Sequence, residues 1–491
     1  MVLNKLQPGD SVYCVGIKGT GVCALAELMH NAGFKVSGSD TTEKFYTDEI
    51  LKELKIPYYE NFDSSRITKD ISLLIYSAAY STVLNPELAR AAEIGIPAIK
   101  YTDALGQWSA RFDSTGICGV HGKTTTTALC GVLAQAVNLP AQILTGSASF
   151  GGRSTLFLGD KYFIAETCEY RRHFLSFHPN RLILTSVESD HHDCFPEYES
   201  IRDAFIEYCH LLPQGGQIIY CADDNGATEV AQIIKTERSD IEIIPYGFSA
   251  LSDYRILSYN VENERAVFKL AGFDGEFKLS IPGKHTALNA AAALALIVLL
   301  NESPLCMEKL QSVKDALENF KSTKRRSERI GEVFCKDGGS IIFMDDYGHH
   351  PTAIKSTLEG IKSFYPARRL IVSFMSHTYS RTGALFNEFV SCFNSADILY
   401  LHRIYASARE KYNGVVDGKA LFEKTEQKRS SCGKETYYVD EPEDAFEPLC
   451  RILKSGDLFI TLGAGNNWVL AEKLFKHYAE SYNCKEKETS L

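Results

Sequence analysis

The sequence lacks the features that mark several large classes of protein. Its 14 cysteines form no C-x-x-C pair, so neither a zinc ribbon nor a disulfide framework is indicated, and free thiols in a reducing compartment are expected. The net charge of −10 argues against non-specific nucleic-acid binding. The longest apolar run, residues 290–300, is too short to span a bilayer, and no basic-then-apolar leader opens the chain. These absences predict a cytoplasmic protein with neither a nucleic-acid nor a membrane partner.

The chain of 491 residues is too long for one hydrophobic core and predicts about three domains. Strand-like apolar runs alternate with helical stretches along most of it, which is typical of α/β domains with parallel sheets. A second such unit starts near residue 108 with a glycine-rich loop, and a third begins near residue 321. We therefore expect domains over residues 1–107, 108–320 and 321–491.

The most specific motif is the glycine-lysine-threonine loop at residues 119–127. It follows an apolar run and precedes a predicted helix, an arrangement in which backbone N–H groups point at phosphate oxygens. Lys123 can reach the β- and γ-phosphates, and the Thr124 hydroxyl can ligand Mg²⁺. Ile117 stands where the full pattern has a glycine, so the loop is a variant. Against the alternative of a plain glycine turn, the motif predicts an ATP site that comprises Gly119, Val120, His121, Gly122, Lys123, Thr124 and Thr125.

A second glycine motif, Gly16-Ile-Lys-Gly-Thr-Gly21, follows the first predicted strand. Asp40 lies about 20 residues further on, as in a dinucleotide-binding fingerprint. The motif itself requires only that a ligand place a pyrophosphate at the helix N-terminus. NAD, FAD and a nucleotide-sugar diphosphate all meet this requirement. A tight turn without a ligand is the remaining alternative.

Two polar groups follow predicted strands of the central region. Residues 162–165 end in Glu166, and residues 182–185 lead to Glu188-Ser-Asp-His191. Because the carboxyl ends of neighbouring parallel strands share one crevice, Glu166 and His191 are placed to ligand a metal beside the triphosphate. Mg²⁺ prefers oxygen, so a histidine ligand is unusual and Mn²⁺ is an alternative ion. A surface carboxylate and a structural histidine are the competing interpretations.

The C-terminal region carries two polar segments, residues 345–352 and 376–382, each after a predicted strand. Both can therefore face a common cleft. In an acidic protein, His349, His377 and Arg381, with Arg325 and Arg326 at the domain junction, are suited to binding anions. Solvated basic residues and hydrogen-bonded structural histidines are the alternative.

In chain order these motifs resemble the Mur ligase family, and the resemblance covers nearly the whole chain. The motifs are Gly16-Ile-Lys-Gly-Thr-Gly21, Gly119-x-x-Gly-Lys-Thr-Thr-Thr, Ile164-Ala-Glu166, Glu188-Ser-Asp-His191, Pro282-Gly-Lys-His-x-Ala-Leu-Asn289, Arg325-Arg326, Asp346-Tyr-Gly-His-His-Pro-Thr352 and His377-x-x-x-Arg381-Thr. The resemblance implies an α/β protein of three domains. A Rossmann-like N-terminal domain would bind a UDP-sugar, a P-loop-type ATPase sheet would bind ATP, and a Rossmann-like C-terminal domain would bind the amino acid.

The implied activity is ATP-dependent ligation of L-alanine to the lactyl carboxylate of UDP-N-acetylmuramate through an acyl phosphate, in peptidoglycan precursor synthesis. Cell-wall biogenesis, cell shape and cell division would depend on it. Sister ligases that add later residues carry a carbamylated lysine, and residues 202–206 offer none, which favours the alanine-adding type. The partners would be three small molecules, UDP-N-acetylmuramate, L-alanine and ATP, with Mg²⁺ as cofactor, and the enzyme would be a monomer or a dimer.

The resemblance also implies roles for single residues. Lys123 would hold the γ-phosphate, Thr124 and Glu166 would share one Mg²⁺, and His191 would ligand a second. Asn289 would contact adenine, and Arg325 would reach the phosphate region. The UDP-sugar site would comprise Gly16, Gly19, Thr20, Gly21, Asp40 and Ser77. The muramyl and alanine site would comprise Tyr347, His349, His377 and Arg381.

One departure from the family pattern and three rival functions stay open. The family's acidic run after the metal glutamate is replaced by Thr-Cys-Glu-Tyr-Arg171, which leaves the role of Glu169 undefined. The first rival is a recycling ligase that joins a tripeptide to the same UDP-sugar. The others are a catalytically dead nucleotide-binding regulator and an NAD-dependent dehydrogenase.

Overall fold

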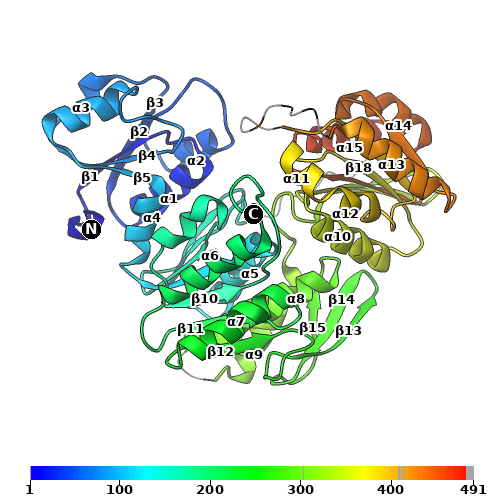
Figure 1. Ribbon diagram of the computed structural model, residues 1–491, viewed down its shortest axis with the longest axis horizontal. Coiled ribbons are helices and arrows are strands. Elements are labelled where there is room, and N and C mark those ends of the chain that lie inside the picture. The colour runs from blue at the N-terminus through cyan, green and yellow to red at the C-terminus, as the bar shows by residue number, and fades with distance from the viewer. Residues whose placement is uncertain are drawn as a thin grey trace. The chain divides into compact units, whose positions relative to one another are not determined.

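The computed structural model describes residues 2–301, 304–406, 410, 412, 414 and 416–482 (Figure 1). Its contacts divide the chain into two compact units. The first comprises Met1–Glu188, Glu199–Arg255 and Asn289–Ala316, and the second comprises Ser189–Tyr198, Ile256–Leu288 and Leu317–Leu491. Within the described residues, none of the helices combines the length and the apolar character needed to cross a membrane.

The first unit begins with a five-stranded parallel sheet in the order β3-β2-β1-β4-β5. Its strands are β1 (Ser11–Val15), β2 (Lys35–Ser39), β3 (Tyr58–Tyr59), β4 (Ile71–Tyr76) and β5 (Ala98–Lys100). Its helices are α1 (Thr20–Asn31), α2 (Thr47–Glu53), α3 (Pro86–Ile94) and α4 (Tyr101–Ser109). Local sequence explains the ends of α3, because Asn85 caps its first turn and Gly95, at φ +76°, ends it. This strand order is Rossmann-like.

A seven-stranded sheet follows in the order β12-β11-β10-β6-β9-β7-β8, with only β8 antiparallel to its neighbour. Its strands are β6 (Asp113–Cys118), β7 (Ala141–Leu144), β8 (Thr155–Phe157), β9 (Tyr162–Glu166), β10 (Arg181–Leu184), β11 (Gln217–Cys221) and β12 (Glu242–Tyr246). The helices of this region are α5 (Lys123–Ala136), α6 (Tyr198–His210), α7 (Asn225–Glu237), α8 (Lys284–Leu300) and α9 (Met307–Asn319). The central strands are buried along nearly their full length, as expected for a parallel sheet covered on both faces.

The second unit contains a small antiparallel sheet and a larger mixed sheet. The small sheet comprises β13 (Ile256–Glu262), β14 (Arg265–Leu270) and β15 (Phe277–Leu279). A two-residue turn with positive φ at both Asn263 and Glu264 joins β13 to β14, the geometry favoured in tight hairpins. From sequence we placed these strands in the central domain, whereas their contacts group them with the C-terminal region. The three predicted domain boundaries stay a prediction.

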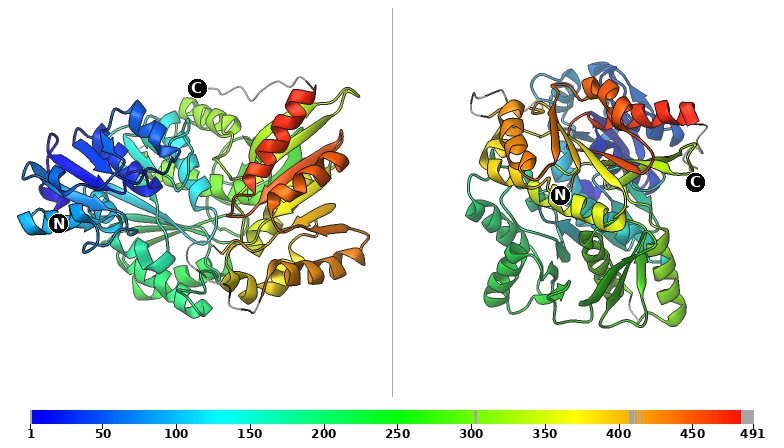
Figure 2. Two further views of the ribbon diagram at one scale, coloured as in Figure 1. Left: turned by 90° about the horizontal axis from the view of Figure 1, so that it is seen from above. Right: turned by 90° about the vertical axis from the view of Figure 1, so that its right-hand side faces the viewer.

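The larger sheet has six strands in the order β16-β17-β21-β18-β19-β20, with β16 antiparallel and the others parallel. Its strands are β16 (Glu328–Phe334), β17 (Ser340–Asp346), β18 (Arg369–Phe374), β19 (Ile398–Leu401), β20 (Glu435–Tyr438) and β21 (Asp457–Leu462). Its helices are α10 (Pro351–Phe364), α11 (Tyr379–Ala384), α12 (Phe386–Ser391), α13 (Gly418–Ser430), α14 (Phe446–Ile452) and α15 (Trp468–Tyr482). Helix α15, red in Figure 2, lies along one face of the sheet, where Leu474 and Tyr478 pack on Phe343 and Phe459. The prediction of an α/β protein with mainly parallel sheets is confirmed.

Candidate active site

The phosphate loop joins β6 to α5 and is held by the end of β10. A Cβ atom on Gly119, where φ is +132°, would lie 2.2 Å from Thr185 Oγ1, so this position requires glycine. The N–H of Val120 donates to Ser186 O at 3.1 Å, and the N–H of His121 donates to Ser186 Oγ at 2.9 Å. The loop is therefore anchored to a neighbouring strand.

Lys123, the first residue of α5, makes an ion pair with Glu169. Its Nζ lies 3.1 and 2.9 Å from the two carboxylate oxygens of Glu169 and 2.5 Å from Gly119 O. Burial by itself lowers the pKa of Lys123, but the charge of Glu169 and smaller contributions from Cys168 and Glu166 raise it above its ordinary value. The ammonium therefore stays charged. Glu169, whose role the sequence left undefined, is the buried partner of this lysine.

Thr124 and Glu166 bring two oxygen donors together. The Thr124 hydroxyl donates a hydrogen bond of 2.8 Å to Glu166 Oε2, which also accepts one of 2.7 Å from the N–H of Gly146. Hydroxyl and carboxylate oxygens are the ligand types that Mg²⁺ prefers, so the donor set fits this ion. His191 lies in the second unit beside Asp190, with its backbone N–H donating to Asp190 Oδ1 at 2.7 Å. Its role as ligand of a second metal stays a prediction.

The side chain of Asn289 lies against the phosphate loop. A Cβ atom on Gly122 would lie 2.6 Å from Asn289 Oδ1, and Gly122 has a φ of +80°. The carboxamide therefore packs on the loop backbone directly before Lys123. The expected contact of Asn289 with adenine stays a prediction.

The second glycine motif surrounds the start of α1. Gly19 is the N-cap of this helix, and Thr20 and Gly21 are its first two residues. A Cβ atom on Gly16 would lie 3.0 Å from Ser77 Cβ. Asp40 accepts a hydrogen bond of 2.7 Å from the N–H of the residue at position 18. The structure thus gathers all six residues predicted for the UDP-sugar around one helix N-terminus, which favours an anion there.

Lys18 was not predicted as a functional residue, although it holds a loop next to this motif. Its buried Nζ donates to Thr41 O at 2.9 Å, to Glu43 O at 3.0 Å and to Glu60 Oε1 at 2.8 Å. It also lies 3.2 Å from Asp48 Oδ1. The only signal in the sequence was a lysine between glycines, and its partners lie 23 to 42 residues further along the chain.

In the second unit, the predicted anion-binding residues form one cluster. The ring centroids of Tyr347 and His349 are 5.1 Å apart, and those of His349 and His377 are 5.7 Å apart. Arg381 Nη1 lies 3.3 Å from His377 Nδ1, and Arg381 Nε donates to Asp190 Oδ1 at 2.7 Å. Burial and the charge of Arg381 hold the pKa of His349 well below its usual range, so this ring is neutral.

Arg325 is held at the ends of β17 and β21. Its Nε donates to Asp345 Oδ2 at 2.8 Å, and its Nη2 donates to Gly463 O at 2.6 Å. Its guanidinium lies 5.1 Å from the centroid of the Tyr347 ring. Burial raises the pKa of Asp345 to about 6, although Arg325 opposes the shift. These contacts join Arg325 to the cluster of Tyr347.

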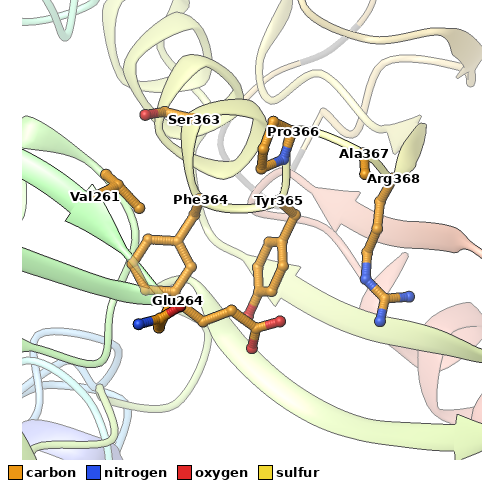
Figure 3. A pocket seen from close by; sticks show the side chains of 9 residues that line it. Val261, Glu264, Ser363, Phe364, Tyr365, Pro366, Ala367 and Arg368 are labelled. Atoms are coloured by element: carbon orange, nitrogen blue, oxygen red, sulfur yellow. The ribbon is translucent and has the colours of Figure 1, made fainter.

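A pocket of about 310 Å³ lies elsewhere in the second unit, between the β13–β14 turn and the end of α10 (Figure 3). Its lining comprises Val261, Asn263, Glu264, Ser363, Phe364, Tyr365, Pro366, Ala367 and Arg368. It contains none of the residues predicted from the sequence for substrate binding.

Comparisons with known proteins agree with the resemblance over nearly the whole chain. Three family profiles match: "Mur ligase family, catalytic domain" over residues 11–113, "Mur ligase middle domain" over 117–297 and "Mur ligase, glutamate ligase domain" over 325–465. A UDP-N-acetylmuramate–L-alanine ligase of Treponema pallidum subsp. pallidum is 47% identical over 97% of this chain and 98% of its own length. The enzyme of that name from Borreliella afzelii is 40% identical over 95% of this chain and 98% of its own.

Solved structures show the same fold. The UDP-N-acetylmuramate-alanine ligase of Thermotoga maritima superposes with a TM-score of 0.71 at 23% identity, covering 96% of this chain and 99% of that one. A murein peptide ligase from Psychrobacter arcticus 273-4 gives a TM-score of 0.62 at 20% identity, with the same coverage. With relatives at 47% identity over nearly full length and three family profiles in sequence order, the chain belongs to the Mur ligase family.

Proposed function

We propose that this protein joins L-alanine to the lactyl carboxylate of UDP-N-acetylmuramate at the expense of ATP, in the synthesis of peptidoglycan precursors. The observation that carries the proposal is the 47% identity, over 97% of the chain, to a relative named UDP-N-acetylmuramate–L-alanine ligase. The grouping of Lys123, Thr124 and Glu166 at the phosphate loop supports the use of ATP.

The chemistry proceeds in two balanced steps. The lactyl carboxylate attacks the γ-phosphorus of ATP, which forms an acyl phosphate and releases ADP. The neutral amine of alanine then attacks the acyl carbon, and inorganic phosphate leaves from the tetrahedral intermediate. Both steps bring anions together, so fixed positive charge stabilises the transition states.

The residues of the first unit suit the phosphoryl transfer. Lys123 would bind the γ-phosphate, because its ammonium is charged and its loop is anchored to β10. Thr124 and Glu166 would hold Mg²⁺, which when bound neutralises phosphate charge. Gly16, Gly19, Thr20, Gly21, Asp40 and Ser77 would bind the UDP-sugar around the start of α1. Asn289 would contact the adenine from its place beside the loop.

The cluster in the second unit suits the other substrates. Tyr347, His349, His377 and Arg381 would line the muramyl and alanine site, His191 would ligand a second metal ion, and Arg325 would stabilise phosphate charge. The support for these roles is their common location next to Asp190 and at the ends of β17 and β21. The low pKa of His349 suits a ring that accepts or donates a hydrogen bond without carrying charge.

The test is phosphate release from ATP and Mg²⁺ in the presence of UDP-N-acetylmuramate, with and without L-alanine. Release that requires both substrates is the expected result. Release with the murein tripeptide but not with alanine would assign the protein to the recycling ligases instead. Release with neither would contradict the ligase function and favour a nucleotide-binding regulator.

A further inference from the structure

The one basic residue of the N-terminal glycine motif (residues 16–21) is turned into the protein. This residue is Lys18, whose side chain is 0% exposed. An ammonium has three N–H groups, and all three are donors. Its Nζ lies 2.9 Å from Thr41 O, 3.0 Å from Glu43 O and 2.8 Å from Glu60 Oε1. Each of the three protons therefore has an acceptor in the protein, and solvent does not reach the side chain.

The backbone of Lys18 is held as well as its side chain. Its N–H donates to Asp40 Oδ2 at 2.7 Å, and its carbonyl accepts a hydrogen bond of 2.6 Å from Thr47 Oγ1. Asp40 Oδ1 also accepts from the N–H of Thr41 at 2.8 Å and from the Tyr80 hydroxyl at 2.9 Å. Since β2, β1 and β4 are neighbours in the sheet, these contacts join the loops that follow three adjacent strands.

Two carboxylates balance the charge of Lys18. Its Nζ lies 3.2 Å from Asp48 Oδ1, in addition to the contact with Glu60, and Asp48 Oδ2 accepts a hydrogen bond of 2.8 Å from the N–H of Phe45. Burial by itself lowers the pKa of Lys18, but Glu60 and Asp48 raise it above its ordinary value, so the ammonium stays charged. Lys18 thus ties both ends of the β2–α2 loop, residues 41–46, to the glycine motif.

We propose that Lys18 is a positioning residue for the UDP-sugar site, whose ammonium fixes the β2–α2 loop against the glycine motif without touching the diphosphate itself. This inference rests on the proposed function. The first N–H groups of α1, at Thr20 and Gly21, have no carbonyl to bind within the helix and are suited to the diphosphate. Lys18 would hold the frame that presents these N–H groups, and a frame that is ordered before the ligand arrives lowers the cost of binding.

The experiment measures the binding of UDP and of ATP by titration calorimetry. Lys18→Met keeps the length of the side chain and removes the ammonium. Lys44→Met is the matched control, because it removes the same charge from the same loop and from the same partner, Glu60, but at a side chain that is 67% exposed. We expect Lys18→Met to weaken UDP about tenfold or more and to leave ATP unchanged, whereas Lys44→Met should stay within about twofold of wild type for both. In turnover, KM for the UDP-sugar should rise in Lys18→Met while KM for ATP stays constant.

Asp48→Asn separates positioning from direct binding by the sign of its effect. If Lys18 bound the diphosphate, removal of a competing carboxylate would leave more positive charge for the ligand, and UDP would bind more tightly. If Lys18 acts by positioning, the loss of the Asp48 charge loosens the same loop, and UDP should bind more weakly. The double variant Lys18→Met/Asp48→Asn should then weaken UDP by less than the product of the two single effects, because both substitutions break one pair.

Three results would overturn the inference alone, provided that wild-type protein binds UDP and turns over normally. They are wild-type UDP affinity in Lys18→Met, an equal loss of affinity for UDP and ATP in that variant, and unchanged or tighter UDP binding in Asp48→Asn. Urea unfolding shows whether Lys18→Met is folded, and if it is not, Asp48→Asn decides by itself. Wild-type protein that does not bind UDP would overturn the proposed function, and this inference with it.

Discussion

The hydroxyl of Thr124 and the carboxylate of Glu166 are joined by a hydrogen bond of 2.8 Å, although 42 positions separate them in the chain. Parallel pairing of β6 with β9 accounts for this, because Glu166 lies in register with Ile117, just before the phosphate loop. Two oxygen donors suited to one Mg²⁺ are thereby placed by the backbone of the sheet rather than by a flexible segment.

Removing the Thr124 hydroxyl should change the response to Mg²⁺. We expect Thr124→Val to raise the Mg²⁺ concentration for half-maximal phosphate release and to lower kcat about 100-fold or more, since one ligand and its charge stabilisation are lost. Thr124→Ser keeps the oxygen and should stay within a few-fold of wild type. An unchanged Mg²⁺ response in Thr124→Val would remove Thr124 from the metal site.

Substitution of Lys123 should separate catalysis from UDP-sugar binding. Lys123→Ala is expected to lower turnover by about 10²- to 10³-fold or more, because the positive charge at the transferring phosphoryl group is lost. UDP-N-acetylmuramate should still bind, since its predicted residues surround α1. Retained activity would contradict the assignment of the phosphate loop.

The partner of Lys123 provides a separate test of stability. Lys123→Met removes the ammonium that pairs with the buried carboxylate of Glu169, so we expect a loss of about 3–5 kcal/mol in the free energy of unfolding. The double variant Lys123→Met/Glu169→Gln should recover most of this loss and remain inactive. Urea unfolding measures both effects, and failure of the double variant to recover would mean that the pair does not determine the stability.

The buried pair of Arg381 and Asp190 should make stability depend on acid pH. Burial alone would raise the pKa of Asp190, but the charge of Arg381 lowers it well below its usual value. The stability that the pair contributes is therefore fully present above the pKa that Asp190 has in the unfolded chain, about 4. It is lost as the pH falls through the lower pKa that Asp190 has in the folded protein. Arg381→Met should lower the free energy of unfolding by about 3–5 kcal/mol at pH 7, and this difference from wild type should become smaller below about pH 4.

Urea unfolding at several pH values measures the effect of Arg381→Met. The matched control is Arg172→Met, which breaks an exposed ion pair with Glu207 and should cost about 1 kcal/mol or less. A similar loss in the two variants would contradict the role assigned to the buried pair.

His402 should weaken the fold at mildly acid pH. Its Nε2 lies 2.8 Å from Ser373 Oγ and its Nδ1 lies 3.0 Å from Val439 O, and burial lowers its pKa to about 4. Between about pH 6.5 and pH 4 the His402 ring is protonated in the unfolded chain but stays neutral in the folded protein. The free energy of unfolding therefore falls as the pH falls. Between pH 7 and pH 5, the free energy of unfolding should therefore fall by about 2 kcal/mol less in His402→Gln than in wild type. Urea unfolding at several pH values measures this, and an equal pH dependence of the free energy of unfolding in the variant and in wild type would contradict it.

The fold class and the family could be predicted from local patterns. Alternating apolar and helical stretches indicate α/β sheets because each strand or helix takes its pattern from neighbouring residues. The phosphate loop is equally local, since Gly119, Gly122, Lys123 and Thr124 lie within six positions and their backbone geometry depends on that short segment.

Other features depend on residues far apart in the chain. The sequence left Glu169 without a role and gave no sign that Lys18 binds Glu60. It also gave no sign that the contacts of β13–β15 group them with the C-terminal region. The close packing of α4 on another region, with Gly106 against Ser176 O, had no motif of its own either. Contacts between such distant segments leave no periodic pattern in the sequence.

The sequence by itself therefore determined the elements, the phosphate loop and the family, because these follow from local spacing and residue type. Only the tertiary structure decided which charges are paired: Lys123 with Glu169, and Arg381 with Asp190 across 191 positions. The physical reason is that the cost of burying a charge is offset only by a partner at close range, and the approach of two distant segments is set by the packing of whole sheets and helices.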